Sequence, residues 1–289
     1  MAIIVNTNLS ALKTQKNLTS ATNSMNKALN RMTTGYKINQ ASDDAAGLYV
    51  ATGIETQIRG SKVAKDNIAT GKNVLQTAEG DLDTILTHLN RIRDLAVQAG
   101  NSIYDTDGYA AIEKEVEARW DEIDRVANAS NFNGLKLLGG AAADGTKITE
   151  LRLQVGANAF VDENSIKITG VFGDTTTAAV AGGATIRDTA AFDSATNAAA
   201  YINTIDTAIN TISTKKSTIG AMINRLDSAE QSLTTTIENA TAAKSTIMDA
   251  DIAEESMNYT KAQILQQTSA ALLVQANALP QIAISLVQG

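Results

Sequence analysis

The chain has 289 residues, a formal net charge of −7, a single proline, a single histidine and no cysteine. The lack of cysteine excludes disulfides, thiolate nucleophiles and cysteine-ligated metals, and the acidic balance argues against nucleic acid as the main partner. Only 4% of the residues are aromatic, so the composition favours long helices that pack through aliphatic seams. No apolar run reaches the ~18 residues that indicate a membrane span.

Charge is distributed unevenly along the chain. Residues 262–289 carry no charged side chain, and residues 1–42 contain no Asp or Glu. The cations of that first segment are Lys13, Lys16, Lys27, Arg31 and Lys37. The two ends are therefore chemically distinct from the acidic body of the chain, which is the first indication of function.

Apolar residues seven positions apart predict the first helix; they are Ile4, Ala11, Leu18, Met25 and Met32. Gly35 is expected to stop this helix. Ser42 or Asp43 is expected to cap the next one, and capping explains the Asp43-Asp44 pair better than cation binding does.

A long helix is predicted from about residue 44 to residue 99, with the alternating seam of a coiled coil. One stripe of the seam consists of Ile68, Leu75, Leu82, Leu89 and Ala96, and the other of Ala78, Ile85, Ile92 and Ala99. At 1.5 Å per residue, such a helix is roughly 80 Å long. Glycines at positions 53, 60, 71 and 80 lie inside it and weaken it.

A shorter helix is predicted beyond Gly100, and its apolar face consists of Ile112, Val116, Trp120, Ile123 and Val126 or Ala127. Asn133-Gly134 is a turn signal. Residues 139–199 are rich in Gly, Ala, Thr and Asp. Two alternating runs within them, at 151–155 and 166–168, predict a pair of short strands.

A second heptad stripe predicts another long helix from about residue 201; its members are Ile205, Ile212, Ile219, Leu226, Leu233, Ala240 and Ile247. The last helix is predicted over residues 254–279, ending before Pro280.

Together these elements predict a mainly α fold, an elongated antiparallel coiled-coil-like helical rod from both chain halves with a small β-rich central insert. The expected domains are the terminal helices (1–42 and 250–289), the rod (43–138 and 200–249) and the outward-facing insert (139–199). The terminal pair buries little by itself, so it is expected to order against neighbouring copies. Its expected assembly residues are Ile4, Leu18, Met25, Leu265 and Leu272, and the heptad residues of the rod are expected to serve both core and assembly.

No residue pattern indicates catalysis. The single histidine, His88, lies beside the seam residue Leu89, and no Asp, Glu or second His is placed to complete a metal site or a triad. The sequence therefore predicts no enzyme activity, no metal and no cofactor.

Several segments resemble bacterial flagellins, in the order of that family and at both ends of the chain. The N-terminal segments are NTNLSA (6–11), TGYKIN (34–39), ASDDAAGL (41–48), LNRIRDLAVQ (89–98), EIDR (122–125) and FNG (132–134). The C-terminal segments are KAQILQQ (261–267) and QANALPQ (275–281). The resemblance covers roughly the first 140 and the last 90 residues.

The resemblance implies a structural subunit that polymerises into the extracellular flagellar filament for swimming motility, with its termini in the inner core. It implies export through the flagellar type III channel, which needs no signal peptide. The implied partners are further copies of the chain, an export chaperone, the cap protein and junction proteins.

The resemblance also implies recognition by the flagellin-sensing Toll-like receptor. The matching positions are Arg91, Leu95 and Glu115. Asp94 stands where Glu is usual in the family, and Trp120 where an aliphatic residue is common.

Two alternatives to a flagellin stay open. A hook–filament junction protein shares the terminal design, although segment 89–98 is of the flagellin type. A secreted amphipathic helical effector would release dye from liposomes as a monomer, without growth of a polymer.

Overall fold

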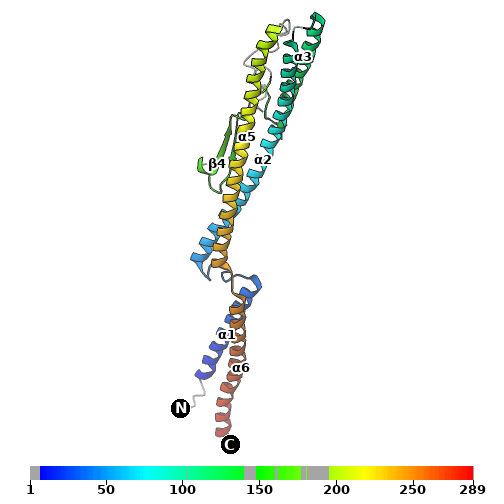
Figure 1. Ribbon diagram of the computed structural model, residues 1–289. Helices are drawn as coiled ribbons and strands as arrows, with labels where there is room; N and C mark the ends of the chain where they lie inside the picture. Colours follow the sequence, from blue (N-terminus) through cyan, green and yellow to red (C-terminus); the bar gives the residue numbers. More distant parts are fainter. Residues whose placement is uncertain are drawn as a thin grey trace. The chain divides into compact units, whose positions relative to one another are not determined.

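The computed structural model describes residues 7–101, 103–139, 148–159, 162–176, 180 and 195–288. Among these residues most belong to long helices, namely α1 (Leu9–Thr34), α2 (Ala45–Ala99), α3 (Thr106–Ala129), α5 (Ala195–Met248) and α6 (Ile252–Gln288) (Figure 1). The short elements are β1 (Asn131–Phe132), β2 (Leu135–Lys136), β3 (Glu150–Gln154), the 3₁₀ turn η1 (Asp162–Asn164) and β4 (Ser165–Thr169). The predicted mainly α fold is confirmed. No described helix is both long and apolar enough to cross a membrane.

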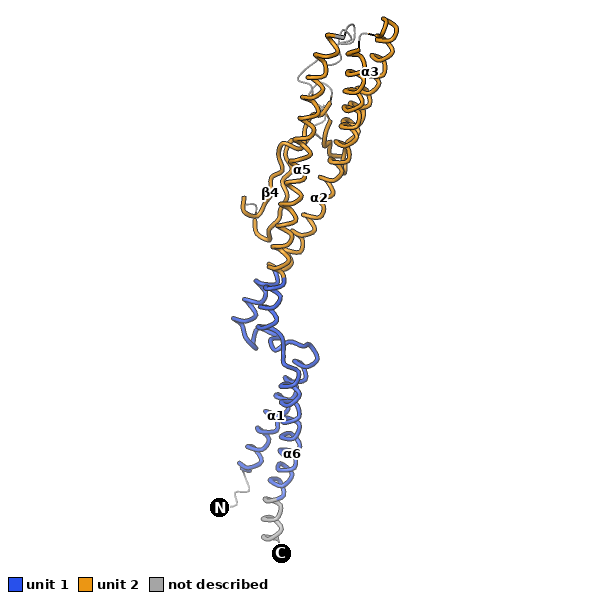
Figure 2. The backbone as a smooth tube through the Cα atoms, in the orientation of Figure 1, with its two compact units in different colours: residues 1–56, 238–289 blue, residues 57–237 orange. Residues whose placement is uncertain are grey.

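The chain divides into two compact units (Figure 2). Unit 1 contains residues 1–56 and 238–289, and unit 2 contains residues 57–237. This division follows packing, so it cuts through α2 and α5. The domain boundaries expected from the order of the helices stay a prediction. Within the expected insert, residues 140–147, 160, 161, 177–179 and 181–194 lie outside the described residues.

Aliphatic heptad residues form the core of unit 2. The buried residues include Ile68, Leu75, Leu82 and Leu89 of α2, and Ile205, Ile212, Ile219, Leu226 and Leu233 of α5. Helix α3 adds the face expected from its spacing, with Ile112, Val116, Trp120, Ile123, Val126 and Ala127 all buried. A continuous aliphatic core of this kind stabilises the unit through burial of roughly 25 cal/mol per Å² of apolar surface.

Ion pairs show that α2 and α5 run antiparallel within unit 2. Lys72 Nζ lies 2.9 Å from Asp227 Oδ1 and 2.7 Å from Glu230 Oε2. Further along α2, Arg93 Nε lies 2.7 Å from Asp206 Oδ1. Rising numbers on one helix therefore meet falling numbers on the other, as predicted for the two halves of the chain.

The strand pair predicted in the central insert is present. Strands β3 and β4 are antiparallel, with Leu151 opposite Ile168 and Leu153 opposite Ile166. The Asn133-Gly134 turn is also present, with positive φ at both residues (50° and 82°). That turn joins β1 to β2, and these two-residue strands were not predicted because they are too short to show alternation.

Two of the glycines within α2 have a packing reason. A Cβ atom added to Gly60 would lie 2.8 Å from Cβ and 3.1 Å from Cα of Ala157, and one added to Gly71 would overlap the side chain of Leu153. Glycine at these positions therefore lets β3 and the segment after it pack directly on α2.

The cap of α2 differs from the prediction. Asp44 fills this position, since its Oδ1 accepts a hydrogen bond from the Gly47 backbone N–H at 2.9 Å. Asp43 instead pairs with Lys27 at 2.8 Å and accepts from the Asn39 backbone N–H. The pKa of Asp43 is lowered chiefly by the hydrogen bond from Lys27.

The predicted end of the last helix before Pro280 is wrong, because α6 continues to Gln288. A proline inside a helix has no N–H to donate to the carbonyl four residues earlier, here that of Ala276. The Asn8 side chain supplies the missing donor, with Nδ2 2.8 Å from the Ala276 oxygen. The carbonyl that Pro280 leaves free is therefore satisfied from another helix.

Candidate assembly surfaces on the terminal helices

Helices α1 and α6 pack against each other through small side chains. The buried residues of this pair are Ala21 and Ala28 from α1, and Glu255, Ala262, Ser269 and Ala276 from α6, each set spaced by seven. Alanine and serine allow close approach of two helices but bury little apolar area. The seam therefore contributes modestly to the stability of unit 1.

Polar contacts fix the antiparallel register of α1 and α6. Arg31 Nη1 lies 2.8 Å from Glu255 Oε1, and the Glu255 side chain is only 9% exposed. Gln266 Nε2 donates to Thr22 Oγ1 at 3.1 Å, in addition to the bond between Asn8 and the Ala276 carbonyl. These contacts lie at both ends and in the middle of the pair.

Several large apolar side chains of the pair are exposed to solvent. On α1, Leu9 is 76% and Leu12 is 65% exposed. Among the described side chains of α6, the exposed large apolar residues are Ile252, Met257, Ile264, Leu265, Leu272 and Val274. We call the terminal pair inverted relative to a soluble helical hairpin, because its fully buried residues, apart from Glu255, are small and several of its large apolar residues are exposed.

Two shallow grooves follow these exposed residues. The first, of about 500 Å³, is lined by Leu9, Leu12, Lys13, Gln15, Lys16 and Thr19, and we call these residues the α1 outer face. The second, of about 470 Å³, is lined by Ser256, Met257, Thr260, Lys261, Ile264 and Leu265, and we call these the α6 outer face. Each set recurs every three or four positions, so it occupies one side of its helix.

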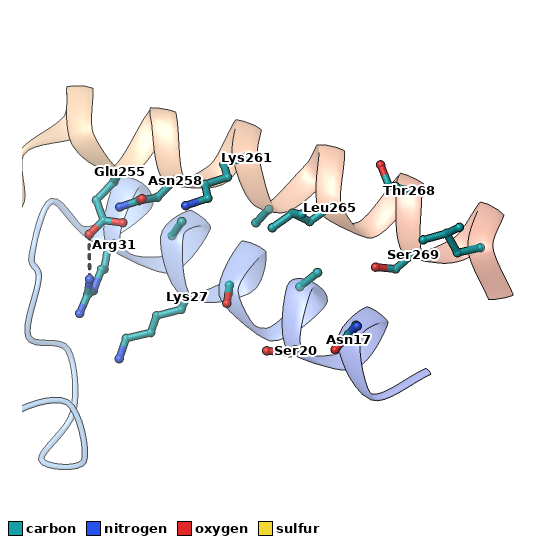
Figure 3. Close-up of a pocket in the computed structure, with 15 residues that line it drawn as sticks. Asn17, Ser20, Lys27, Arg31, Glu255, Asn258, Lys261, Leu265, Thr268 and Ser269 are labelled. Carbon is teal, nitrogen blue, oxygen red and sulfur yellow. Dashed lines mark hydrogen bonds and ion pairs between the residues drawn. The ribbon is translucent and has the colours of Figure 1, made fainter. Parts of the chain in front are cut away.

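A third groove, of about 670 Å³, runs between α1 and α6 (Figure 3). Leu265 and Leu272 line it, together with polar residues of both helices such as Asn17, Ser20 and Asn258. The ion pair of Arg31 and Glu255 lies at one end of the groove (Figure 3). The mixture of leucine and short polar side chains suits a protein surface better than a small apolar ligand.

The residues expected to mediate assembly occupy different positions in this pair. Leu18 and Met25 are half-buried beside the seam, whereas Leu265 and Leu272 are exposed. Ile4 lies outside the described residues. The sequence analysis missed the small-residue seam of α6. The seven-residue spacing of its members, from Glu255 to Ala276, could have indicated it. The assembly role of all these residues stays a prediction.

The region matched to receptor recognition lies on α2 and α3 of unit 2. Arg91 Nε donates to Glu115 Oε1 at 2.9 Å, and Arg119 approaches the same carboxylate at 3.6 Å. Leu95, by contrast, is only 2% exposed and belongs to the core of unit 2. The fold thus brings Arg91 and Glu115 together at the surface and places Leu95 beneath it.

His88 lies near the charged side chains of Arg119, Glu122 and Arg125. Burial lowers its pKa most, followed by the charge of Arg119. Throughout the described part of the chain, no cluster of three His, Asp or Glu side chains could hold a metal ion.

A helical chain with such an inverted terminal pair belongs to the class of structural subunits that are completed by further copies of themselves. Residues 5–143 match the bacterial flagellin N-terminal helical region, and residues 202–287 match the bacterial flagellin C-terminal helical region. The chain belongs to the bacterial flagellin family, and it is a structural subunit of the extracellular flagellar filament.

Relatives of similar length support this assignment. The chain is 36% identical to a flagellin of Bacillus subtilis over 98% of its own length and 99% of the relative. It is also 36% identical to a flagellar filament core protein of Brachyspira hyodysenteriae, over 99% and 100% of the two chains. A solved structure from Vibrio parahaemolyticus, described as a flagellar hook-associated protein, has a TM-score of 0.59 at 16% identity and covers 72% of this chain and 100% of its own. At that identity the likeness concerns the fold alone.

Proposed function

We propose that the outer faces of α1 and α6, with the groove between them, are the surfaces through which copies of this chain polymerise into a filament for swimming. The inverted terminal pair carries the proposal. Burying one leucine side chain contributes about 1.5–3 kcal/mol, so covering Leu9, Leu12, Ile264 and Leu265 would add several kcal/mol for each neighbour. In an isolated chain these side chains stay exposed to water, whereas in a polymer the neighbouring copies bury them and so stabilise the assembly.

Seeded growth tests this proposal. Purified monomer should elongate sonicated filaments, as seen by electron microscopy, and deletion of residues 1–30 should abolish growth while circular dichroism still shows the long helices. Leu12→Ser should raise the critical concentration at least about tenfold, since each 1.4 kcal/mol changes an equilibrium tenfold. Val63→Ser, at an exposed position of α2, is the matched control. Filaments formed by the truncated chain would overturn the proposal.

The terminal helices also suit the export chaperone, the cap protein and the junction proteins as partners before and after polymerisation. Exposed leucines on a helix of a monomer need cover during export, because contiguous apolar surface promotes aggregation. Leu265→Ser with Leu272→Ser should weaken chaperone binding measured by calorimetry. Unchanged binding would exclude these two leucines of α6 as part of the chaperone site.

A second proposed function is recognition by the flagellin-sensing Toll-like receptor. The pairing of exposed Arg91 with Glu115 favours it, because α2 and α3 present both groups at one place on unit 2. Arg91→Ala should reduce signalling by monomer in reporter cells, and Arg125→Ala, at another exposed arginine paired on α3, should not. Leu95→Ala would act through the core of unit 2. Circular dichroism of this variant shows whether lost signalling results from a disturbed fold. An unchanged dose response of Arg91→Ala would refute this role.

A further inference from the structure

The turn between β1 and β2 places an asparagine directly before a glycine. Asn133-Gly134 is the one Asn-Gly pair in the sequence, and both residues are exposed. Both also have positive φ (50° and 82°), as the two central residues of a type I′ hairpin turn require. The Asn133 carboxamide and the Gly134 peptide nitrogen therefore follow each other along the chain at a solvent-exposed hairpin tip.

Neither of these two groups is held by a hydrogen bond. Within the part of the chain that the structure describes, the Asn133 side chain and the Gly134 N–H have no hydrogen-bond partner. Apart from the chain neighbours of Gly134, no described atom lies within 4 Å of the position that its Cβ would take. Glycine also has no side chain to crowd the nitrogen beside it. An unbonded carboxamide next to an uncrowded amide nitrogen is the pair of reactants of intramolecular deamidation.

Comparable groups nearby are restrained. The side-chain Nδ2 of Asn131 donates to a backbone carbonyl of α3 at 2.8 Å, and Asn128 belongs to α3, where the backbone N–H groups bond within the helix. In the Asp-Gly pair at 107–108, the glycine N–H donates to Asp105 Oδ1 at 2.9 Å. The fold therefore leaves Asn133 as the reactive position in this part of unit 2.

We propose that Asn133 is a site of self-modification, at which the chain deamidates and forms isoaspartate. The Gly134 nitrogen attacks Cγ of Asn133, the bond from Cγ to Nδ2 breaks, and the proton of the Gly134 N–H leaves with the amide nitrogen as ammonia. Water then opens the resulting succinimide ring at either carbonyl carbon, which gives aspartate or isoaspartate. Nothing is oxidised or reduced, and water is the only co-reactant.

The fold permits this reaction without unfolding of unit 2. The attack requires the Gly134 nitrogen to swing toward Cγ of Asn133, which needs a local opening of the hairpin. The hairpin pairs only Asn131 with Lys136 and Phe132 with Leu135. Because few contacts break, this opening costs little free energy.

Isoaspartate at position 133 should disrupt the β1–β2 hairpin. Its peptide linkage runs through Cβ, so it lengthens the backbone of the turn by a carbon atom and adds a carboxylate. Turn geometry fixes the register of a hairpin, so the strand pairs lose their alignment. The next contact along the chain is the Leu137 N–H, which donates to the Ser130 carbonyl at 3.2 Å, and Leu137 is buried in the core of unit 2. The modification thus loosens the segment that follows α3.

Ageing of the purified full-length chain at mildly alkaline pH tests this proposal. Trypsin releases peptide 126–136, and mass spectrometry with electron-based fragmentation locates aspartate and isoaspartate within it. Product should form at Asn133 at least about tenfold faster than at Asn128 or Asn131, the ratio that a barrier difference of about 1.4 kcal/mol gives. The rate should rise in proportion to the hydroxide concentration, because the attacking nitrogen must lose its proton.

Two variants locate the reaction. Asn133→Gly keeps a residue that suits a type I′ turn and should abolish the product in peptide 126–136. The matched variant Asn101→Gly, at another exposed position, should leave the rate at Asn133 unchanged. Undiminished deamidation of peptide 126–136 in Asn133→Gly would assign the reaction to another residue and overturn the proposal.

Two further results would contradict the proposal. Product that forms in the urea-unfolded chain but not in the folded chain would show that the hairpin protects Asn133. In the isoaspartyl chain, hydrogen exchange of the Leu137 amide should rise about fivefold, as expected for the loss of one hydrogen bond. An unchanged exchange rate of this amide would overturn the inferred effect on the hairpin.

Discussion

At the scale of single residues, Asn8 combines two functions. Its Oδ1 accepts a hydrogen bond from the Ala11 backbone N–H at 3.0 Å and so caps α1, while its Nδ2 donates to the carbonyl that Pro280 leaves without a helical partner. Serine caps helices about as well as asparagine, but its hydroxyl is too short to span both contacts. One amide therefore couples the start of α1 to the proline of α6.

We predict that Asn8→Ser loosens the terminal pair by about 1 kcal/mol, the net value of one hydrogen bond. Hydrogen exchange of the α1 and α6 backbone amides in the monomer should rise about fivefold. In a Pro280→Ala background the residue at 280 again donates to Ala276, so the effect of Asn8→Ser should largely vanish. Equal effects in both backgrounds would show that Asn8 and Pro280 are not coupled.

Tyr201 gives unit 2 a dependence on alkaline pH. Trp120 Nε1 donates to Tyr201 Oη at 2.8 Å, and burial raises the pKa of Tyr201 from 10.0 to about 12. Because the folded state favours the neutral phenol, its contribution is complete below a pH of about 10 and is lost as the pH rises toward about 12.

The expected loss is up to about 3 kcal/mol over this pH range, at 1.36 kcal/mol per pKa unit. Urea unfolding followed by Trp120 fluorescence should therefore show falling stability, and Tyr201→Phe should flatten the pH dependence. Lys72 has a raised pKa because of its hydrogen bonds to Glu230 and Asp227, so part of the slope should persist. Tyr49→Phe, at an exposed position, should leave the profile unchanged; a similar flattening there would contradict the assignment.

At the scale of elements, the glycines of α2 differ in what they contact. Gly60→Ala should destabilise unit 2 by about 1–3 kcal/mol, because the new methyl group meets the backbone of Ala157. Gly80 has no atom of the described residues within 4 Å of an added Cβ. Gly80→Ala should therefore stabilise α2 by up to about 1 kcal/mol through helix propensity. The urea midpoint of unfolding measures the stability change of each variant. A change in the same direction for both variants would contradict the explanation by packing.

The helices of the core were predictable because large aliphatic residues recur every seven positions. Ile68 to Leu89 and Ile205 to Leu233 leave few alternatives for the buried face. The β3–β4 pair followed from the alternation of Leu151 and Leu153. The heptad residues that indicate the helices are buried, and the leucines that indicate the strand pair are partly buried against the core.

The terminal pair was harder to predict because its strongest apolar signal does not mark its seam. Leu265 and Leu272 outrank Ala262 and Ser269 in hydrophobicity, yet the small residues are buried against α1, while the leucines line the open groove between the helices and stay about half exposed. A single sequence does not separate contacts within a chain from contacts between chains. The last helix was wrongly predicted to end before Pro280 for a related reason. The hydrogen-bond donor that compensates for the missing N–H of Pro280 lies 272 residues earlier, at Asn8.

At the scale of the whole molecule, the two units should differ in stability. Unit 2 buries a continuous aliphatic core, whereas the seam of α1 and α6 buries mostly alanine. We predict that amides of α1 and α6 exchange hydrogen in the monomer at least about tenfold faster than those of α3, since local opening costs less where fewer apolar contacts break. Polymerisation should slow the exchange of α1 and α6 most. Equal protection of both units in the monomer would contradict this prediction.

The alanine and serine of the terminal seam have a consequence for motion. Side chains of nearly equal size recur every seven residues, so sliding α1 along α6 by two turns would replace one small contact with another. Resistance to such sliding comes from the polar contacts of Arg31 with Glu255, Thr22 with Gln266 and Asn8 with Ala276. The two helices can therefore slide along each other in steps of two turns, provided that those few polar contacts exchange partners.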